Sequence, residues 1–163
     1  MDLKIYCKNG KLRRVFPVEE EEYFQEIIEI EGLSECLNEF KDNKNLKKII
    51  DDSVNGKEVD FSYYFDFDDL NLTNFQKKVL KETFKIPNGE IRTYKEVGEA
   101  IGSKAYRAIG NALNKNPLFY IIPCHRVVGT NMKLTGFRSG LELKKEMLLK
   151  EGFKIENNRI IIE

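Results

Sequence analysis

Residues 93–114 read TYKEVGEAIGSKAYRAIGNALN, and this stretch decides the fold that we expect for the chain. Thr93 and Glu96 have the T-x-x-E spacing of a capping box, which begins a helix. Gly102 ends that helix, because glycine readily takes the left-handed backbone found at helix C-termini. A second stretch with the amphipathic spacing of a helix follows shortly after Gly102. Two helices joined by a tight glycine turn predict a helix-turn-helix module.

The second helix of this module is predicted over residues 104–114, with Ser103 as its N-cap. The spacing i, i+4, i+7 places three residues on its buried face, namely Ala105, Ile109 and Ala112. The opposite face carries cations and amides around one small residue, namely Lys104, Arg107, Ala108, Asn111 and Asn114. Such a face can reach phosphates and base edges, although an ordinary solvated helix face is the alternative. Residues 75–84, which follow the capping residue Thr73, predict a preceding helix.

The charges of the chain are divided unevenly along its 163 residues. The 27 Lys+Arg and 27 Asp+Glu give a net charge of zero, which by itself argues against a nucleic-acid partner. However, residues 1–74 hold 10 basic and 18 acidic residues, a net −8, whereas residues 75–151 hold 15 and 7, a net +8. We therefore predict two domains, residues 1–74 and 75–163, of which the basic one suits a polyphosphate.

The acidic part has the composition of short strands mixed with helix. Strands are predicted at residues 3–6, 12–16 and 61–65, and the Asn9-Gly10 pair predicts a turn between the first two. Helices are predicted at residues 19–30 and 33–40, and residues 66–74 have the composition of a linker. The expected fold class is therefore α+β. No apolar run approaches the about 18 residues of a membrane span, so no membrane is expected as a partner.

The three cysteines, Cys7, Cys36 and Cys124, predict no disulfide framework. The first ten residues lack the features of a secretory signal, so we expect a cytoplasmic protein whose thiols stay reduced. A structural zinc site takes about four ligands, and three scattered cysteines with the single His125 are too few. No metal is therefore expected.

Cys124 follows an apolar run, residues 118–122, that is predicted to be extended. A neighbouring base lowers the cost of ionising a thiol, and His125 is the next residue. Successive side chains of a strand point to opposite faces, so contact between the two requires a backbone turn, which Pro123 can supply, or a bridging water. From these residues alone, a buried structural cysteine beside an incidental histidine fits as well as a nucleophile.

The segment Pro123-Cys124-His125-Arg126-Val127 resembles the active-site signature of the O6-alkylguanine-DNA alkyltransferases, the methylated-DNA–protein-cysteine methyltransferases. The resemblance covers residues 75–152 in consistent order, whereas residues 1–74 match only in size and strand content. The other matching fragments are Phe75-Gln76, Thr93-Tyr94, residues 105–110, Asn116-Pro117, residues 136–140 and residues 148–152. It implies an N-terminal ribonuclease-H-like β-sheet domain and a C-terminal helical domain with a winged-helix-like helix-turn-helix.

The function that the resemblance implies is direct repair of O6-alkylguanine, with O4-alkylthymine as an open second substrate. Cys124 accepts the alkyl group as a thiolate and keeps it as a thioether, so each molecule acts once and needs no cofactor. His125 acts as a base through a water, and Glu151 orients its ring. Tyr94 donates or polarises the proton that the departing guanine takes up. Asn116 ties the second helix to the cysteine segment.

The same resemblance implies how damaged DNA is held. The base must leave the duplex to be reached, and Arg107 fills the vacated space. Ser139 hydrogen-bonds O6, and the backbone of Cys124 and Val128 reads the guanine edge. The second helix enters the minor groove of double-stranded DNA through its small and polar residues, Lys104, Ala105, Ala108 and Asn111. We expect a monomer.

Two residues depart from the family pattern. Family members more often have a smaller residue at the position of Tyr106, which leaves open how closely the second helix approaches DNA. Some members have a tyrosine at the position of Arg138, which leaves open how bulky alkyl groups fit. One alternative function is a non-catalytic protein that binds lesions or regulates, although related sensors lack the cysteine. Another is a Cys-His hydrolase, for which no oxyanion hole is evident. The size of the alkyl group, cooperativity on DNA and the fate of the alkylated protein stay open.

Overall fold

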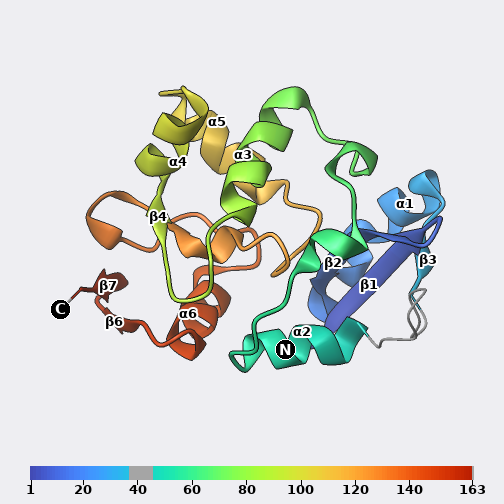
Figure 1. Ribbon diagram of the computed structural model, residues 1–163, viewed down its shortest axis with the longest axis horizontal. Helices are drawn as coiled ribbons and strands as arrows, with labels where there is room; N and C mark the ends of the chain where they lie inside the picture. The colour runs from blue at the N-terminus through green and yellow to red at the C-terminus, as the bar shows by residue number, and fades with distance from the viewer. Residues whose placement is uncertain (37–45, 163) are drawn as a thin grey trace. The chain divides into compact units, whose positions relative to one another are not determined.

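A computed structural model describes residues 1–36 and 46–162 of the chain (Figure 1). The chain forms two compact units, one of Met1–Asn71 with Pro117–Ile121 and one of Leu72–Asn116 with Ile122–Glu163. Strands and helices occur in both, which confirms the α+β class. The units separate between residues 71 and 72, and the domain boundary at residue 74 stays a prediction.

The first unit contains an antiparallel sheet of order β2-β1-β3. Its strands are β1 (Leu3–Lys8), β2 (Lys11–Pro17) and β3 (Ser34–Glu35). Asn9 and Gly10 both have positive φ, 53° and 74°, so the predicted hairpin turn is confirmed. Phe16 of β2 is buried and stacks on Phe24 of the neighbouring helix, with ring centroids 4.6 Å apart. This stacking joins the sheet and the helix in one hydrophobic core.

The helix predicted over residues 19–30 is confirmed as α1 (Glu21–Glu31), which a 3₁₀ turn (Val18–Glu20) precedes. It ends at Gly32, whose φ of 65° is left-handed. The helix predicted over residues 33–40 is wrong where it can be compared, since β3 pairs there with β1, and residues 37–40 lie outside the described residues. The next helix is α2 (Leu46–Val54).

The strand predicted at residues 61–65 is wrong, because Phe61–Tyr64 is a 3₁₀ helix. The Asp60 side chain accepts a hydrogen bond from the Ser62 N–H at 3.0 Å and so caps it. Phe61 and Tyr64 are both buried, and the three-residue repeat of a 3₁₀ helix places them on one face. The aromatic residues of this segment favour a strand in the sequence, but the burial of Phe61 and Tyr64 on one side stabilises the 3₁₀ helix instead. A second 3₁₀ turn, Phe67–Asp69, lies in the predicted linker.

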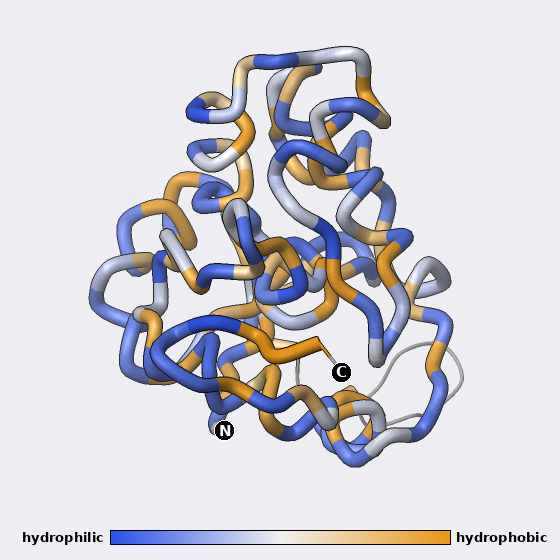
Figure 2. Tube along the Cα trace, turned by 90° about the vertical axis from the view of Figure 1, so that its left-hand side faces the viewer, coloured by the Kyte–Doolittle hydropathy of each residue, from blue (hydrophilic) through white to orange (hydrophobic). Residues whose placement is uncertain are grey.

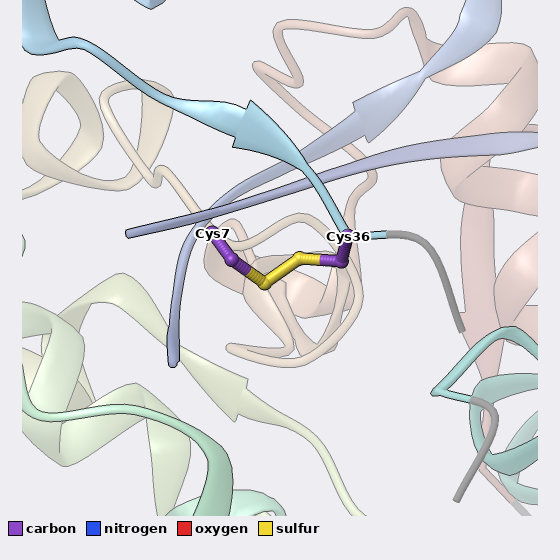
Figure 3. Close-up of a disulfide and its surroundings, with 2 residues drawn as sticks. All are labelled: Cys7 and Cys36. Carbon is purple, nitrogen blue, oxygen red and sulfur yellow. A yellow bond between two sulfur atoms is a disulfide. The ribbon is translucent and has the colours of Figure 1, made fainter. Parts of the chain in front are cut away.

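Cys7 and Cys36 form a disulfide, which corrects the prediction that the chain has none (Figure 3). Strand pairing brings the two residues together: Cys7 lies opposite Ser34, and the Cys36 N–H donates to the Ile5 carbonyl at 2.9 Å. Their Cα atoms are 5.5 Å apart, a usual disulfide spacing. The prediction assumed a reducing compartment, although intracellular proteins of hyperthermophiles are an exception to that rule.

The second unit is mainly helical. Its helices are α3 (Asn74–Phe84), α4 (Tyr94–Ile101), α5 (Tyr106–Asn114) and α6 (Leu141–Lys150). Thr73 with Gln76 and Thr93 with Glu96 both form complete capping boxes, so the predicted starts of α3 and α4 are confirmed. Short strands form two pairs, β4 (Arg92–Thr93) with β5 (Val127–Val128) and β6 (Lys154–Glu156) with β7 (Arg159–Ile161).

The turn between α4 and α5 is longer in sequence than predicted. Gly102 is left-handed with a φ of 71°, as expected, but α5 begins at Tyr106 and not at residue 104. The Ser103 hydroxyl accepts the Ala105 N–H at 3.1 Å, so it stabilises the turn and is not the N-cap of α5. A Cβ on Gly98 would lie 2.5 Å from the Ser103 carbonyl oxygen, so only glycine allows this approach.

Burial in α5 follows the predicted pattern in part. Ile109 and Ala112 are buried, as expected, but Ala105 precedes the helix and is exposed. A separate core of four buried residues supports α6 and the C-terminal strands, namely Val128, Leu134, Leu148 and Ile160. Hydrophilic and hydrophobic residues alternate along the helices (Figure 2), as expected of helices with one buried face. Among the described residues, no helix is long and apolar enough to cross a membrane.

Candidate active site

Two parallel strands bring the start of α4 to the cysteine segment. In the pair β4 and β5, Arg92 lies opposite Val127 and Thr93 opposite Val128. β4 leads directly into Tyr94, the first residue of α4, and β5 follows directly on a 3₁₀ turn, Cys124–Arg126. The parallel pairing therefore places two segments that are about thirty residues apart in the sequence side by side.

The segment before the cysteine does not form the extended run that was predicted. Residues 118–122 are buried but irregular, with turns in which the Ile121 N–H donates to the Phe119 carbonyl at 2.8 Å. Tyr120 has a φ of 68°, which no strand residue has. The backbone also turns at Cys124, whose N–H donates to the Ile122 carbonyl at 2.8 Å. The turn that contact between neighbouring side chains requires is therefore present.

Asn116 holds the cysteine from the end of α5. Its side chain is 2% exposed, and its Nδ2 donates to the Ile122 carbonyl at 2.8 Å and to the Cys124 Sγ at 3.3 Å. Burial raises the pKa of the Cys124 thiol, and the Asn116 hydrogen bond, followed by the charges of Lys144 and Arg138, opposes that rise. An amide N–H stabilises a thiolate without adding a charge, so Asn116 favours the nucleophilic form of Cys124.

His125, Arg126 and Glu151 form one buried network. The His125 ring, 0% exposed, is hydrogen-bonded through Nε2 to Glu151 Oε2. Arg126 Nε donates to the other carboxylate oxygen of Glu151 at 2.6 Å, and its Nη1 donates to the Ile86 carbonyl at 2.8 Å. Burial lowers the pKa of His125, so the ring is a neutral base. Hydrogen bonds and charges from His125 and Arg126 hold the pKa of Glu151 below its usual value despite burial.

Tyr94 lies between α5 and the loop that follows β5. Its hydroxyl donates to the Thr135 carbonyl at 3.1 Å, and a Cβ placed on Gly110 of α5 would lie 4.0 Å from its ring. Burial raises the pKa of the phenol, so Tyr94 keeps its proton at neutral pH. Gly136 also lies close, since a Cβ there would be 3.7 Å from the Tyr94 oxygen. Tyr94 is thus a half-buried, protonated phenol close to α5.

The face of α5 that was predicted to point outward is exposed to solvent. Lys104, Arg107, Asn111 and Asn114 are all exposed, and Ala108 among them is half-buried. Tyr106 is 38% exposed, and its ring packs close to Gly98, from which an added Cβ would be 2.9 Å away. The bulk of Tyr106 is therefore directed partly against α4.

The remaining predicted residues lie around the cysteine turn. Val128 is fully buried, so its side chain belongs to the core and its backbone is covered as well. Ser139 is half-buried in the turn before α6. Arg138 Nη1 donates to the carbonyls of Asn114 and Asn116, at 3.2 and 3.1 Å, and thus ties this loop to the end of α5.

Two residues that interact with this site were not predicted from the sequence, Arg126 and Lys144. Arg126 stands inside the cysteine segment and could have been suggested by its position next to His125. Lys144 had no signal, because a lysine in a charged helix is typical of a solvated face. Among residues 1–36 and 46–162, no group of three His, Cys, Asp or Glu side chains could hold a metal ion.

Comparison with known proteins gives a consistent result. Residues 74–153 match the family model described as the 6-O-methylguanine DNA methyltransferase, DNA binding domain. A methylated-DNA–protein-cysteine methyltransferase of Methanosarcina barkeri is 45% identical over 119 residues, which cover 70% of this chain and 72% of that protein. One of Methanosarcina mazei is 51% identical over 89 residues, 54% of this chain but only 53% of that protein.

A solved structure extends the similarity to most of the fold. The chain resembles Mycobacterium tuberculosis OGT, crystallised in complex with DNA, with a TM-score of 0.68 and 28% identity over 91% of this chain and 85% of that one. The chain therefore belongs to the family of methylated-DNA–protein-cysteine methyltransferases. Its activity is the direct repair of DNA by transfer of an alkyl group to a cysteine of its own chain.

Proposed function

We propose that the chain repairs O6-alkylguanine in double-stranded DNA by moving the alkyl group to Cys124, with O4-alkylthymine as an open second substrate. The Sγ thiolate attacks the alkyl carbon, the bond from that carbon to O6 breaks, and its electron pair stays on guanine. Guanine takes up a proton, and the protein keeps a thioether. The reaction is irreversible and occurs once per molecule, and the damaged DNA supplies its driving force.

One observation carries this assignment: the Cys124 sulfur accepts a hydrogen bond from Asn116, and the neutral His125 next to it is held by Glu151. Because Glu151 engages Nε2, Nδ1 is the nitrogen that takes the thiol proton through a water. Glu151 and Arg126 keep the ring in that orientation. The phenol of Tyr94 supplies the proton that guanine needs.

DNA is the partner that the basic second unit fits. We propose that α5 enters the minor groove and that its exposed face contacts the backbone, with Arg107 filling the space left by the flipped base. Ala108 is small enough for a close approach, and we propose that Ser139 hydrogen-bonds O6 of the flipped guanine. A monomeric state and a cytoplasmic location stay expectations from the sequence.

The decisive experiment is mass spectrometry of the protein after incubation with duplex DNA containing O6-methylguanine. We expect one methyl group, on the peptide that contains Cys124, and none on a Cys124→Ser variant. Turnover without an adduct would support a hydrolase, and binding without an adduct would support a lesion-binding protein. Either result contradicts the proposal.

Arg107 is tested by comparing two substrates. For Arg107→Ala we expect transfer from duplex DNA to fall at least tenfold, while transfer from free O6-methylguanine changes less than twofold, because only the duplex needs its vacated space filled. Lys78→Ala, which removes an exposed charge from α3, is the matched control. Equal losses on both substrates would argue against the role of Arg107.

A further inference from the structure

The chain reaches the cysteine turn through a short segment, residues 117–121, that belongs to the first unit, whereas Asn116 before it and Ile122 after it belong to the second. At the base of this segment the Asn116 Nδ2 donates to the Ile122 carbonyl at 2.8 Å. The same carbonyl accepts the Cys124 N–H, also at 2.8 Å. Ile122 therefore joins the side chain that contacts the Cys124 sulfur to the backbone of the cysteine itself.

Two γ-turns of opposite kind carry the chain into Cys124. Tyr120 has a φ of 68°, and across it the Ile121 N–H donates to the Phe119 carbonyl at 2.8 Å. A hydrogen bond from residue i+2 to residue i around a positive φ defines the rare and strained kind of γ-turn. Pro123 is the centre of the common, inverse kind, with a φ of −81° and a ψ of 65°. The chain thus turns sharply twice just before the cysteine.

Tyrosine rarely takes the backbone of the first γ-turn unaided. A left-handed φ brings Cβ too close to a backbone carbonyl oxygen, a cost that glycine avoids and a bulky side chain does not. Such strain persists only where the surrounding structure imposes it, and it is concentrated at functional sites. The contacts that impose it on Tyr120 should therefore be evident in the structure.

Three residues of the first unit hold Tyr120 and its segment. The Tyr120 hydroxyl and the Ser53 Oγ of α2 are hydrogen-bonded at 2.8 Å, and the two residues are only 6% and 8% exposed. The Phe61 ring meets the Tyr120 ring edge-on, with centroids 6.4 Å apart. The Val15 backbone of β2 makes two hydrogen bonds with residues 117–119, of 2.8 and 3.0 Å. The first unit therefore fixes both the ring and the backbone of the segment.

We propose that Tyr120 is a positioning residue of the alkyl-transfer site, because its γ-turn, held by Ser53, sets the place of the Ile122 carbonyl. That carbonyl in turn orients the Asn116 amide, which donates to the Cys124 sulfur at 3.3 Å. Tyr120 acts only through these residues and is not itself catalytic. The proposal rests on Cys124 as the alkyl acceptor, but the link from Ser53 to the cysteine turn can be measured without DNA.

The first test removes the buried hydrogen bond and follows hydrogen exchange of the two γ-turns by NMR, without DNA. For Tyr120→Phe we expect the Ile121 and Cys124 N–H groups to exchange at least tenfold faster relative to the amides of β1, which report a general loss of stability. Ser53→Ala should give the same result, and the double variant should add little, since all three remove one hydrogen bond. Tyr63→Phe, which removes an exposed hydroxyl from the same unit, is the matched control.

The second test separates DNA binding from transfer in single-turnover kinetics with duplex DNA containing O6-methylguanine. For Tyr120→Phe we expect the rate at saturating DNA to fall at least fivefold, because Asn116 no longer holds the Cys124 sulfur in one place. The DNA concentration at half-saturation should change less than twofold, since the exposed face of α5 is untouched. Tyr63→Phe should keep both values.

A merely structural hydrogen bond gives a different result. Its loss would lower the melting temperature but leave the relative exchange of Ile121 and Cys124 and the saturating rate unchanged, which overturns the proposal. Faster exchange with an unchanged saturating rate overturns it as well, because the turn then does not position the cysteine. If the parent chain accepts no methyl group from DNA while the exchange result holds, the proposed function fails and the link from Tyr120 to the cysteine turn stands.

Discussion

Replacing Glu151 by glutamine tests the buried network at its centre. The carboxylate accepts hydrogen bonds from His125 and Arg126, and the three side chains are 5%, 0% and 9% exposed. The substitution keeps the shape of the side chain but removes its charge. Arg126 then stays buried with a positive charge that no anion balances.

The size of the effect follows from that burial. Removal of one partner from a buried ion pair costs about 3–5 kcal/mol, because the other charge remains without water. We therefore expect the free energy of unfolding of Glu151→Gln to fall by about 3 kcal/mol. Since domains are stable by only about 5–15 kcal/mol, such a loss is readily measured. Glu146→Gln, at an exposed residue of α6, the helix that ends just before Glu151, should change stability by less than about 0.5 kcal/mol.

A double variant separates stability from chemistry. Arg126→Met with Glu151→Gln removes both charges of the ion pair, so we expect it to recover at least half of the lost stability. Alkyl transfer should stay about 100-fold slow, because His125 still lacks the carboxylate that orients it as a base. Urea unfolding followed by circular dichroism gives the first quantity, and transfer from free O6-methylguanine gives the second.

Two outcomes would refute this reasoning. Glu151→Gln with the stability of the parent would mean that solvent reaches the carboxylate and that the pair is not buried. A double variant with the rate of the parent would mean that His125 needs no carboxylate, and the base role of the ring would fail with it.

Three further predictions concern pH, the helix turn and the disulfide. The pKa of folded His125 lies below its unfolded value of 6.5, so the unfolded chain binds a proton that the folded chain does not, and stability should fall as the pH drops below about 6.5. The lowered pKa of Glu151 extends the loss below pH 4.5. In urea unfolding from pH 8 to 3, the absence of a slope between pH 6.5 and 4.5 would contradict the first statement, and its absence below pH 4.5 would contradict the second. Gly98→Ala places a Cβ 2.5 Å from the Ser103 carbonyl and should cost about 2 kcal/mol in thermal unfolding, whereas Gly110→Ala, with 4.0 Å to its nearest neighbour, should cost less. Cys7 and Cys36 lie 29 residues apart, so reduction of their disulfide should lower the free energy of unfolding by about 3–4 kcal/mol. Urea unfolding with and without dithiothreitol measures this loss. The Cys124→Ser variant should show the same loss on reduction, because Cys124 is not part of the disulfide.

The sequence predicted the elements whose signals are local. Thr73 and Thr93 each begin a helix by capping an N–H three residues away, and Gly102 ends one through its own backbone. The neighbouring Cys124 and His125 were visible for the same reason. The division into an acidic and a basic part followed from a count of the charged residues in each segment. Such features depend on a few consecutive residues, so no knowledge of distant partners is required to find them.

Tertiary structure alone decided the features that join distant residues. Phe61 and Tyr64 adopt a 3₁₀ turn because both are buried, and Cys7 meets Cys36 because β1 pairs with β3. Arg126 and Lys144 look like ordinary surface cations in the sequence, and only packing shows that Arg126 donates to Glu151 and that Lys144 donates to the Val127 and Thr135 carbonyls. The physical reason is that burial removes water from these groups, and which groups replace that water depends on contacts with residues 9 to 40 positions away in the sequence.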